Sequence, residues 1–336
     1  MADSRNVAVY GAGGHTGRFV AAQLRRRGLR PILCGRDAEK LRAAAPGDAE
    51  IRVADIADAA ALDRAFEGAA AVIHCAGPFL DTALPVLDAA LRARIAYLDV
   101  AAEQASARAI FEGHGAAARA AGVAVVPAAA FYGGLADLLA TAAMADWDGA
   151  DAIDIAVALD GWKPTLGTRL TGRRNTVPRF VLSGGRFQDL ADPAPARAWE
   201  FPPPFGSQEV VALPFTEIVT IAHHLNVSAI GSYMNLAPLR EIGDPRTPGP
   251  AAVDAAGRSA QRFVMEVRVR KGARERRAVA RGQDIYAITG PIAAEAASRI
   301  LDGRNRTRGV TTLGAMFDAA EFLAALAADG LEVERA

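Results

Sequence analysis

Four glycines gather in one short segment near the start of the chain, GAGGHTG at residues 11–17. Glycine permits a tight turn and lets backbone N–H groups approach a phosphate where a side chain would block it. The segment follows the apolar run VAVY and precedes an amphipathic stretch, so it predicts the turn between a first strand and a first helix of a dinucleotide-binding unit. The residues expected to hold the pyrophosphate are Gly11, Gly13, Gly14, His15, Thr16 and Gly17.

The residues after the second apolar run select between the two nicotinamide dinucleotides. NAD-dependent proteins usually place a carboxylate on the ribose 2′-hydroxyl, whereas NADP-dependent proteins place an arginine on the 2′-phosphate. Here Gly35 is followed by both types, Arg36 and Asp37. Asp37 begins a helical stretch and is interpreted as its N-cap, so Arg36 favours NADP over NAD. Asp55, at the end of the third apolar run, either faces the adenine or caps the following helix.

Six short apolar runs, separated by amphipathic stretches, must position these loops. Buried strands are expected at 7–11, 31–35, 51–55, 71–77, 96–100 and 123–129. Helices are expected between them at 15–27, 37–45, 58–67, 82–93 and 104–121. Strands that alternate with helices of this length form βαβ units and a parallel sheet. The predicted fold class is therefore α/β, with a Rossmann-type doubly wound sheet over residues 1–130.

The composition changes after residue 150, where alanine becomes less frequent and proline, threonine and aromatic residues increase. Strands are predicted by alternating apolar and polar residues at 153–159, 262–270 and 276–289. The last two form an antiparallel hairpin around Lys271 and Gly272. A second, α+β domain with a mostly antiparallel sheet is therefore expected over residues 131–288. Helical periodicity returns at 291–303 and 314–328.

The charge balance and the cysteine content exclude several classes of protein. Lys and Arg together number 38, as do Asp and Glu, so no basic excess favours a nucleic-acid partner. Cys34 and Cys75 lie in apolar runs without CxxC spacing, which argues against a disulfide framework and a cysteine zinc site. The five histidines are dispersed, and no metal site is predicted. No signal peptide or membrane-spanning stretch is visible, so we expect the cytoplasm and no membrane partner.

Several familiar catalytic arrangements are missing from the sequence. None of the five tyrosines is followed by lysine four positions later, which excludes the short-chain dehydrogenase mechanism. The chain also has no Walker A loop, no G-x-S-x-G elbow and no HExxH motif. Hydride transfer remains, in which the nucleotide supplies the chemistry and the protein supplies position and a proton.

Candidates for the proton donor follow the later predicted strands, because a doubly wound sheet binds ligands at the carboxyl ends of its strands. Tyr132 follows the sixth strand beside two glycines and is the first choice, since a phenol is neutral at pH 7. Glu103 follows the fifth strand and is the second choice, because burial can keep a carboxyl group protonated. His224 and Tyr233, from the second domain, are candidates for substrate contact. For each of the four a purely structural role stays open.

Six segments of the chain share a pattern with one known family. They are VAVYGAGGHTGRFVAAQL, CGRDAEKL, AVIHCAGPF, YLDVAAEQ, VVPAAAFYGGLADLL and GVTTLGAMFDAAEFLAALAADGLEVE. The chain resembles the saccharopine dehydrogenase (saccharopine reductase)-like family of NADP-dependent oxidoreductases, roughly over residues 1–140 and again over 285–336. The segment HCAGPF is similar to the one whose backbone passes the nicotinamide ribose in that family. The resemblance thus implies cofactor contacts from Ala76, Gly77, Pro78 and Phe79.

The resemblance also implies that C-terminal helices, within 289–336, pack back on the Rossmann domain, and that a homodimer forms through the second sheet. Because the family includes enoyl reductases and other reductases, the resemblance does not fix a substrate. The first functional hypothesis is an NADPH-dependent reductase of an imine or a polarised alkene in a small-molecule metabolite, since the dinucleotide motif is joined to a second domain large enough to enclose a substrate. The alternative is an NADP(H)-binding redox sensor without turnover. Four alanines near the expected nicotinamide favour this alternative, namely Ala101, Ala102, Ala129 and Ala130.

Overall fold

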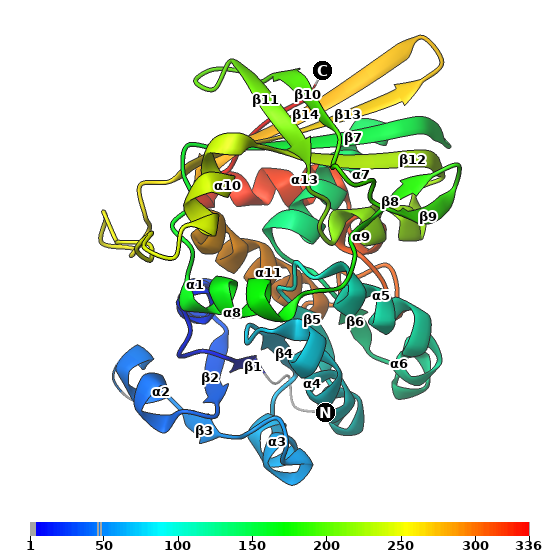
Figure 1. The fold of residues 1–336 in the computed structure, drawn as a ribbon. Coiled ribbons are helices and arrows are strands. Elements are labelled where there is room, and N and C mark those ends of the chain that lie inside the picture. The colour runs from blue at the N-terminus through cyan, green and yellow to red at the C-terminus, as the bar shows by residue number, and fades with distance from the viewer. Residues whose placement is uncertain (1–4, 46, 48, 336) are drawn as a thin grey trace.

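The computed structural model describes residues 5–45, 47 and 49–335. Two β-sheets lie apart, and a layer of helices that includes α7 (Ala136–Met144), α9 (Glu217–His224) and α11 (Ile285–Leu301) separates them (Figure 1). One buried apolar cluster contains Val7 from the first sheet and Val267 from the second. The two halves of the chain are therefore joined by a continuous apolar core.

The first sheet contains seven parallel strands within the described part of the chain, in the order β15-β6-β5-β4-β1-β2-β3. Its strands are β1 (Asn6–Tyr10), β2 (Arg30–Gly35), β3 (Ile51–Val53), β4 (Ala71–His74), β5 (Ala96–Asp99), β6 (Ala124–Val126) and β15 (Gly309–Val310). Its helices are α1 (His15–Arg26), α2 (Ala38–Ala44), α3 (Ala59–Phe66), α4 (Phe79–Ala93), α5 (Gln104–Gly113) and α6 (Gly115–Ala121). The predicted doubly wound fold is confirmed, and its strand order reverses between β1 and β4.

Two helices of this half differ from the prediction. The helix expected at 104–121 is interrupted at His114, which separates α5 from α6 and has a glycine on each side. The helix expected to begin at residue 82 begins at Phe79, because the Glu103 carboxylate accepts hydrogen bonds from its first two N–H groups. Glu103 is more than twenty residues from the start of α4, so the sequence around residue 79 does not reveal that the helix begins there.

The second sheet is mixed and contains nine strands among the residues that the structure describes. They are β7 (Ala150–Leu159), β8 (Phe180–Ser183), β9 (Arg186–Asp189), β10 (Ala196–Glu200), β11 (Ser207–Ala212), β12 (Val227–Asn235), β13 (Arg262–Lys271), β14 (Arg274–Gln283) and β16 (Glu332–Arg335). All paired neighbours are antiparallel except β7 and β12. The predicted second sheet and the hairpin of β13 and β14 are confirmed.

The strand predicted to run to residue 289 is too long. It ends at Gln283, and Asp284, with φ of 59°, separates it from α11. The Asp284 carboxylate accepts hydrogen bonds from the N–H groups of Tyr286 and Ala287, as an N-cap does. The short apolar run after it fits a strand or a buried helix equally well by periodicity, so the cap decides the structure.

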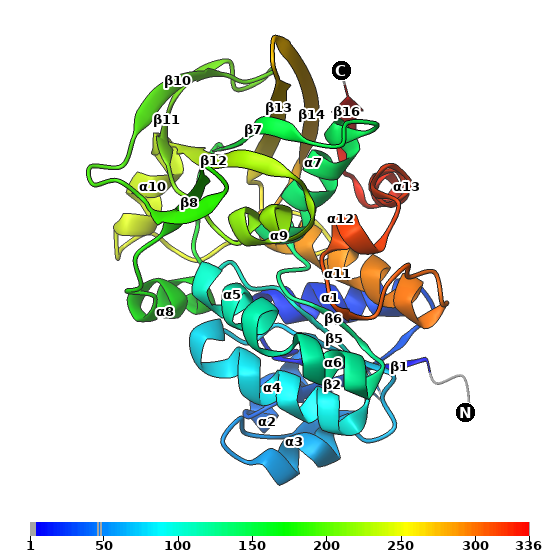
Figure 2. The same ribbon diagram turned by 90° about the vertical axis from the view of Figure 1, so that its right-hand side faces the viewer.

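Helix α11 lies against α1, and both stand between the two sheets (Figure 2). A Cβ atom on Gly290 would lie 2.9 Å from the carbonyl carbon of Phe19, so the glycine lets the two helices approach closely. The remaining helical segments are η1 (Phe131–Leu135), α8 (Leu166–Arg174), α10 (Leu236–Gly243), α12 (Leu313–Met316), α13 (Ala319–Ala325) and η2 (Leu326–Asp329). Among the helices described, none is long and apolar enough to cross a membrane.

Candidate functional site

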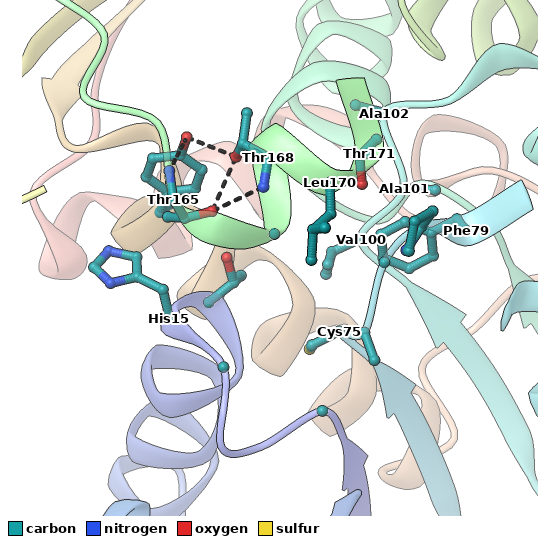
Figure 3. A pocket seen from close by; sticks show the side chains of 18 of the residues that line it. His15, Cys75, Phe79, Val100, Ala101, Ala102, Thr165, Thr168, Leu170 and Thr171 are labelled. Atoms are coloured by element: carbon teal, nitrogen blue, oxygen red, sulfur yellow. Dashed lines mark hydrogen bonds between the residues drawn. The ribbon is translucent and has the colours of Figure 1, made fainter. Parts of the chain in front are cut away.

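A cavity of about 870 Å³ opens between the carboxyl ends of the parallel strands and helix α8 (Figure 3). Its volume is in the upper part of the range common for ligand sites, roughly 300–1,000 Å³. Most of the predicted cofactor contacts line it, namely Gly11, Gly13, Gly14, His15, Thr16, Gly35, Arg36, Ala76, Gly77, Pro78 and Phe79. Both proton-donor candidates, Tyr132 and Glu103, line the same cavity.

Two of the predicted cofactor residues do not line the cavity. Gly17 is buried beneath the glycine loop, where it affects the loop through packing. Asp55 accepts a hydrogen bond from the N–H of Ala57, two residues further on. Helix α3 is capped by Asp58, whose carboxylate accepts from the N–H of Ala61. The structure thus gives Asp55 a role in the local turn and places it outside the cavity lining.

The two substrate candidates from the second half also lie away from the cavity lining. The Nε2 atom of His224 is 2.5 Å from the carboxylate of Asp137, which connects α9 to α7. Tyr233 lies on β12, and the guanidinium of Arg197 is 3.8 Å from the centre of its ring. The structure does not bring His224 and Tyr233 to Tyr132 and Glu103, because both are held by partners elsewhere in the second half.

The glycine loop is shaped by close contacts between backbone atoms. Gly11 has φ of 91°, a conformation that favours glycine, and a Cβ atom there would lie 2.8 Å from the Ala76 nitrogen. A Cβ atom on Gly17 would lie 2.3 Å from the Gly11 carbonyl oxygen. Gly14, the N-cap of α1, has no side chain to cap the helix. The first N–H groups of α1 are therefore free of a side-chain cap and form a site suited to an anion.

His15 lines the cavity and has one ring nitrogen without a partner among the described residues. Its Nδ1 atom lies 3.4 Å from the guanidinium of Arg18, which can only donate, so the neutral ring carries its proton on Nε2. Nε2 is buried and has no hydrogen-bond partner among the described residues. Burial lowers the pKa of His15, which favours this neutral ring. The glycine loop fits a phosphate of a dinucleotide, and His15, directly after Gly14 in this loop, carries an unpaired donor.

The corner of the cavity after β2 carries the residues expected to select the cofactor. Asp37 is the N-cap of α2, where its carboxylate accepts hydrogen bonds from the N–H groups of Glu39 and Lys40, as predicted. Arg36 is exposed and forms no hydrogen bond or ion pair with any residue that the structure describes. The Asp37 carboxylate, which could otherwise hold a ribose 2′-hydroxyl, is thus occupied by the N–H groups of α2. The Arg36 guanidinium is free to bind a 2′-phosphate.

Glu103 holds the loop after β4 in place. It is 1% exposed, and its carboxylate oxygens accept hydrogen bonds from the N–H groups of Phe79 at 2.7 Å and Leu80 at 3.0 Å. Burial raises the pKa of Glu103, and the two hydrogen bonds oppose that shift. Because both oxygens are occupied at the start of α4, the geometry favours a positioning role for Glu103.

Replacing Glu103 by glutamine tests this positioning role. Glutamine offers one acceptor oxygen, so one N–H group of α4 would be left facing an NH₂ group. We expect Glu103→Gln to lower the free energy of unfolding by about 1–3 kcal/mol, measured by denaturant titration. The control is Glu112→Gln, because the Glu112 ion pair with Arg108 is exposed and contributes little. Equal stability of the two variants would contradict the assignment.

Tyr132 lies in the π-helical turn η1 that follows β6. Its side chain is 8% exposed, and its hydroxyl group is buried with no hydrogen-bond partner among the described residues. Its ring stacks on Phe215 with the ring centres 4.1 Å apart. Burial raises the pKa of Tyr132 well above its usual value, so the phenol keeps its proton. Tyr132 lines the cavity, and its buried hydroxyl has an unused hydrogen-bonding capacity.

The opposite wall of the cavity comes from segments that the sequence analysis did not assign to the site. Helix α8 lies across from the glycine loop, and its Leu170 and Thr171 line the cavity (Figure 3). Thr168 of this helix is hydrogen-bonded to the hydroxyl of Tyr286 at 2.8 Å, which attaches α8 to α11. Arg179, between α8 and β8, also lines the cavity. No local motif marks these residues, since only the fold brings them to the glycine loop.

Comparison with family models supports the predicted dinucleotide-binding unit in the first half of the chain. Residues 7–126 match the family model described as the saccharopine dehydrogenase NADP binding domain. This match covers most of the first, parallel sheet. The resemblance predicted from the sequence is confirmed, and the family indicates an oxidoreductase with an NADP-binding domain. No curated protein sequence matches the chain.

Solved structures extend the likeness to the whole fold. Apo saccharopine dehydrogenase (L-Glu forming) from Saccharomyces cerevisiae superposes with a TM-score of 0.69 at 12% identity, covering 98% of this chain and 99% of that one. GenD2 from gentamicin A biosynthesis, in complex with NAD, has a TM-score of 0.47 at 16% identity and coverage of 100% and 97%. A triphenylmethane reductase from Citrobacter sp., complexed with NADP(H), has a TM-score of 0.30 at 24% identity and coverage of 36% and 48%. The yeast enzyme shows that both sheets belong to one known fold.

Proposed function

We propose that this protein is an NADPH-dependent reductase that transfers hydride to an imine or a polarised alkene of a small molecule. The observation that carries the proposal is Tyr132, which lines the same cavity as the glycine loop and Arg36 and whose hydroxyl is buried and unpartnered within the described residues. A cavity that combines a dinucleotide cradle with a protonated, unpaired phenol has both elements that a reduction needs, a hydride source and a proton source.

The residues present fit a dinucleotide. The glycine loop and the uncapped N-terminus of α1 would hold the pyrophosphate, with His15 as an additional donor. Arg36 would hold the 2′-phosphate, and the loop of Ala76, Gly77 and Pro78 would face the nicotinamide half. When bound, NADPH supplies a hydride, and the remaining functions belong to the protein's own side chains.

Tyr132 supplies the proton in this proposal. Hydride addition to a C=N or C=C bond leaves negative charge on the atom that receives no hydride, and a positioned O–H group can protonate that atom as the charge develops. The Tyr132 hydroxyl meets this requirement because burial keeps it protonated and no residue of the described chain competes for it. Phe215 fixes the ring by stacking, and Glu103 fixes the loop after β4.

A redox sensor that binds NADP(H) without turnover is the alternative function. Ala101, Ala102 and Ala130 line the cavity and bring no polar side chain to it, which favours this alternative. A sensor has no need of an unpaired phenol in its cavity, and for this reason we place the reductase first. Oxidation of NADPH against a panel of imino acids, keto acid–amine pairs and enones separates the two, since a sensor binds NADPH and oxidises none.

Cofactor selection provides a prediction for Arg36. A charge-assisted hydrogen bond to the 2′-phosphate contributes about 1.5–3 kcal/mol, so we expect NADPH to bind about 10- to 150-fold more tightly than NADH. Arg36→Ala should remove most of this preference and leave NADH binding nearly unchanged, as measured by calorimetric titration. Arg42→Ala is the matched control, because Arg42 is exposed on α2 and does not line the cavity. Equal affinity of the unmodified protein for the two nucleotides would refute the assignment.

A further inference from the structure

Arg179 is a cation in the cavity that the proposed reaction does not use. It is half-buried and lines the cavity together with Tyr132. Arg36 and Lys40, at the corner expected to hold the 2′-phosphate, are the other arginine and lysine side chains in the lining within the described chain. We propose that Arg179 binds the carboxylate of a substrate whose remaining body is apolar. This inference rests on the proposed function and names the substrate class of the same site.

The guanidinium of Arg179 has free donors. Its Nη1 atom donates to the carbonyl oxygen of Pro214 at 2.5 Å, and its central carbon lies 4.6 Å from the centre of the Phe215 ring. These contacts fix the plane of the guanidinium. Of its five N–H donors, one is hydrogen-bonded to a described residue. A planar guanidinium binds a carboxylate through two parallel hydrogen bonds, and shielding from water strengthens that pair.

The acidic group that acts electrostatically on Arg179 does not neutralise it by direct contact. Glu217 is buried, and one of its oxygens accepts a hydrogen bond from the N–H of Phe215 at 2.9 Å. No ion pair joins Glu217 to Arg179 within the described part of the chain. Burial raises the pKa of Glu217. Arg179 therefore has no anionic partner in direct contact among the described residues, and its remaining N–H donors can bind an anionic ligand.

Much of the lining of the cavity is apolar. It includes Trp162, Leu213, Leu239, Ile242 and Phe215, whose ring contacts the Arg179 guanidinium. The indole N–H of Trp162 donates to the Tyr286 hydroxyl at 2.8 Å, so the indole presents no free polar atom to a ligand. Burying a second charge or several unpaired polar groups against such walls is costly. One carboxylate on an aromatic or aliphatic body satisfies both Arg179 and its surroundings, whereas a compact dicarboxylate does not.

Binding measurements on the NADPH-loaded protein test this substrate class without turnover. The probes are 3-phenylpropionate and octanoate, which have no double bond to reduce, the neutral amide 3-phenylpropionamide, and the dicarboxylate glutarate. The variants are Arg179→Gln, Arg179→Lys and the control Arg173→Gln, because Arg173 is exposed and does not line the cavity. Calorimetry measures each probe, and an NADPH titration of each variant shows whether the nucleotide site is intact.

We expect the two monocarboxylates to bind more tightly than the amide and glutarate. Arg179→Gln should weaken monocarboxylate binding about 10- to 150-fold, the effect of one charge-assisted contact, and leave the amide unchanged. Arg179→Lys keeps the positive charge but lacks the planar guanidinium with its paired donors, so it should lose part of the monocarboxylate affinity. This variant tests the inference if Arg179→Gln does not fold. Arg173→Gln should behave as the unmodified protein.

Three results would overturn the inference while NADPH still binds. They are failure of both monocarboxylates to bind, glutarate binding more tightly than either, and monocarboxylate affinity that is unchanged in the folded Arg179 variants. Failure of the unmodified protein to bind NADPH would instead refute the proposed function. The two failures are thus distinguished by the nucleotide titration alone.

Discussion

Tyr132→Phe is expected to lower turnover by roughly 10²–10⁴-fold, the contribution typical of a positioned general acid. The substitution removes one hydroxyl group that has no hydrogen-bond partner among the described residues, so it leaves no buried group unsatisfied. The phenyl ring keeps its stacking on Phe215. NADPH binding and the free energy of unfolding should therefore stay close to those of the unmodified protein. Turnover is measured with whichever substrate of the imine and enone panel is reduced.

The control for this variant is Tyr233→Phe, which removes a tyrosine hydroxyl outside the cavity lining and should keep full turnover. Because burial raises the pKa of Tyr132 well above its usual value, its proton is retained at neutral and mildly alkaline pH. Ionisation of Tyr132 should accordingly cause no loss of turnover in the unmodified protein between pH 6 and pH 9. This whole range lies below the usual tyrosine pKa of about 10. Full turnover by Tyr132→Phe would exclude Tyr132 as the proton donor.

Gly17→Ala is expected to disrupt the nucleotide site. The added Cβ atom would lie 2.3 Å from the Gly11 carbonyl oxygen and 2.8 Å from the Ala12 Cα atom. Both are backbone atoms, so the loop itself must move. Overpacking of this kind costs typically 1–3 kcal/mol of unfolding free energy. We expect NADPH affinity to fall as well, because the displaced loop carries the N–H groups that face the pyrophosphate.

Gly113→Ala is the matched control for that variant. Gly113 ends helix α5, and a Cβ atom there would have no heavy atom within 4 Å. Alanine at such a position is neutral or slightly stabilising, because it reduces the conformational freedom of the unfolded chain. Denaturant titration and calorimetry of the two variants give the comparison. Gly17→Ala with unchanged stability and NADPH affinity would show that the loop tolerates a side chain.

The parts of the site that lie within single short segments could be predicted from the sequence. The glycine loop and Arg36 each follow a strand directly, so the doubly wound fold brings them to one sheet edge without further information. The segment HCAGPF is also a short local pattern, and the family resemblance assigned its residues 76–79 to the cofactor. The Asp37 cap was predictable for the same reason, since its partners are its own neighbours Glu39 and Lys40. Local signals therefore account for the cofactor half of the cavity.

The substrate half depends on contacts between distant segments. Phe215 reaches Tyr132 only because α9 of the second half packs against η1. His224 was a reasonable candidate by residue type, but its pairing with Asp137 could be seen only in three dimensions. Arg179 is one of 38 lysine and arginine residues, and no sequence motif around it marks it as a ligand-binding residue. Its burial and its position in the cavity distinguish it, and neither is encoded locally.

A crystal structure of the protein bound to NADPH tests the central claim most directly. The account predicts the 2′-phosphate within hydrogen-bonding distance of Arg36 and the pyrophosphate on the glycine loop of residues 11–17. The nicotinamide should lie beside Gly77, in the part of the cavity that Tyr132 lines. A nucleotide bound outside this cavity, or a nicotinamide separated from Tyr132 by the protein, would contradict the account.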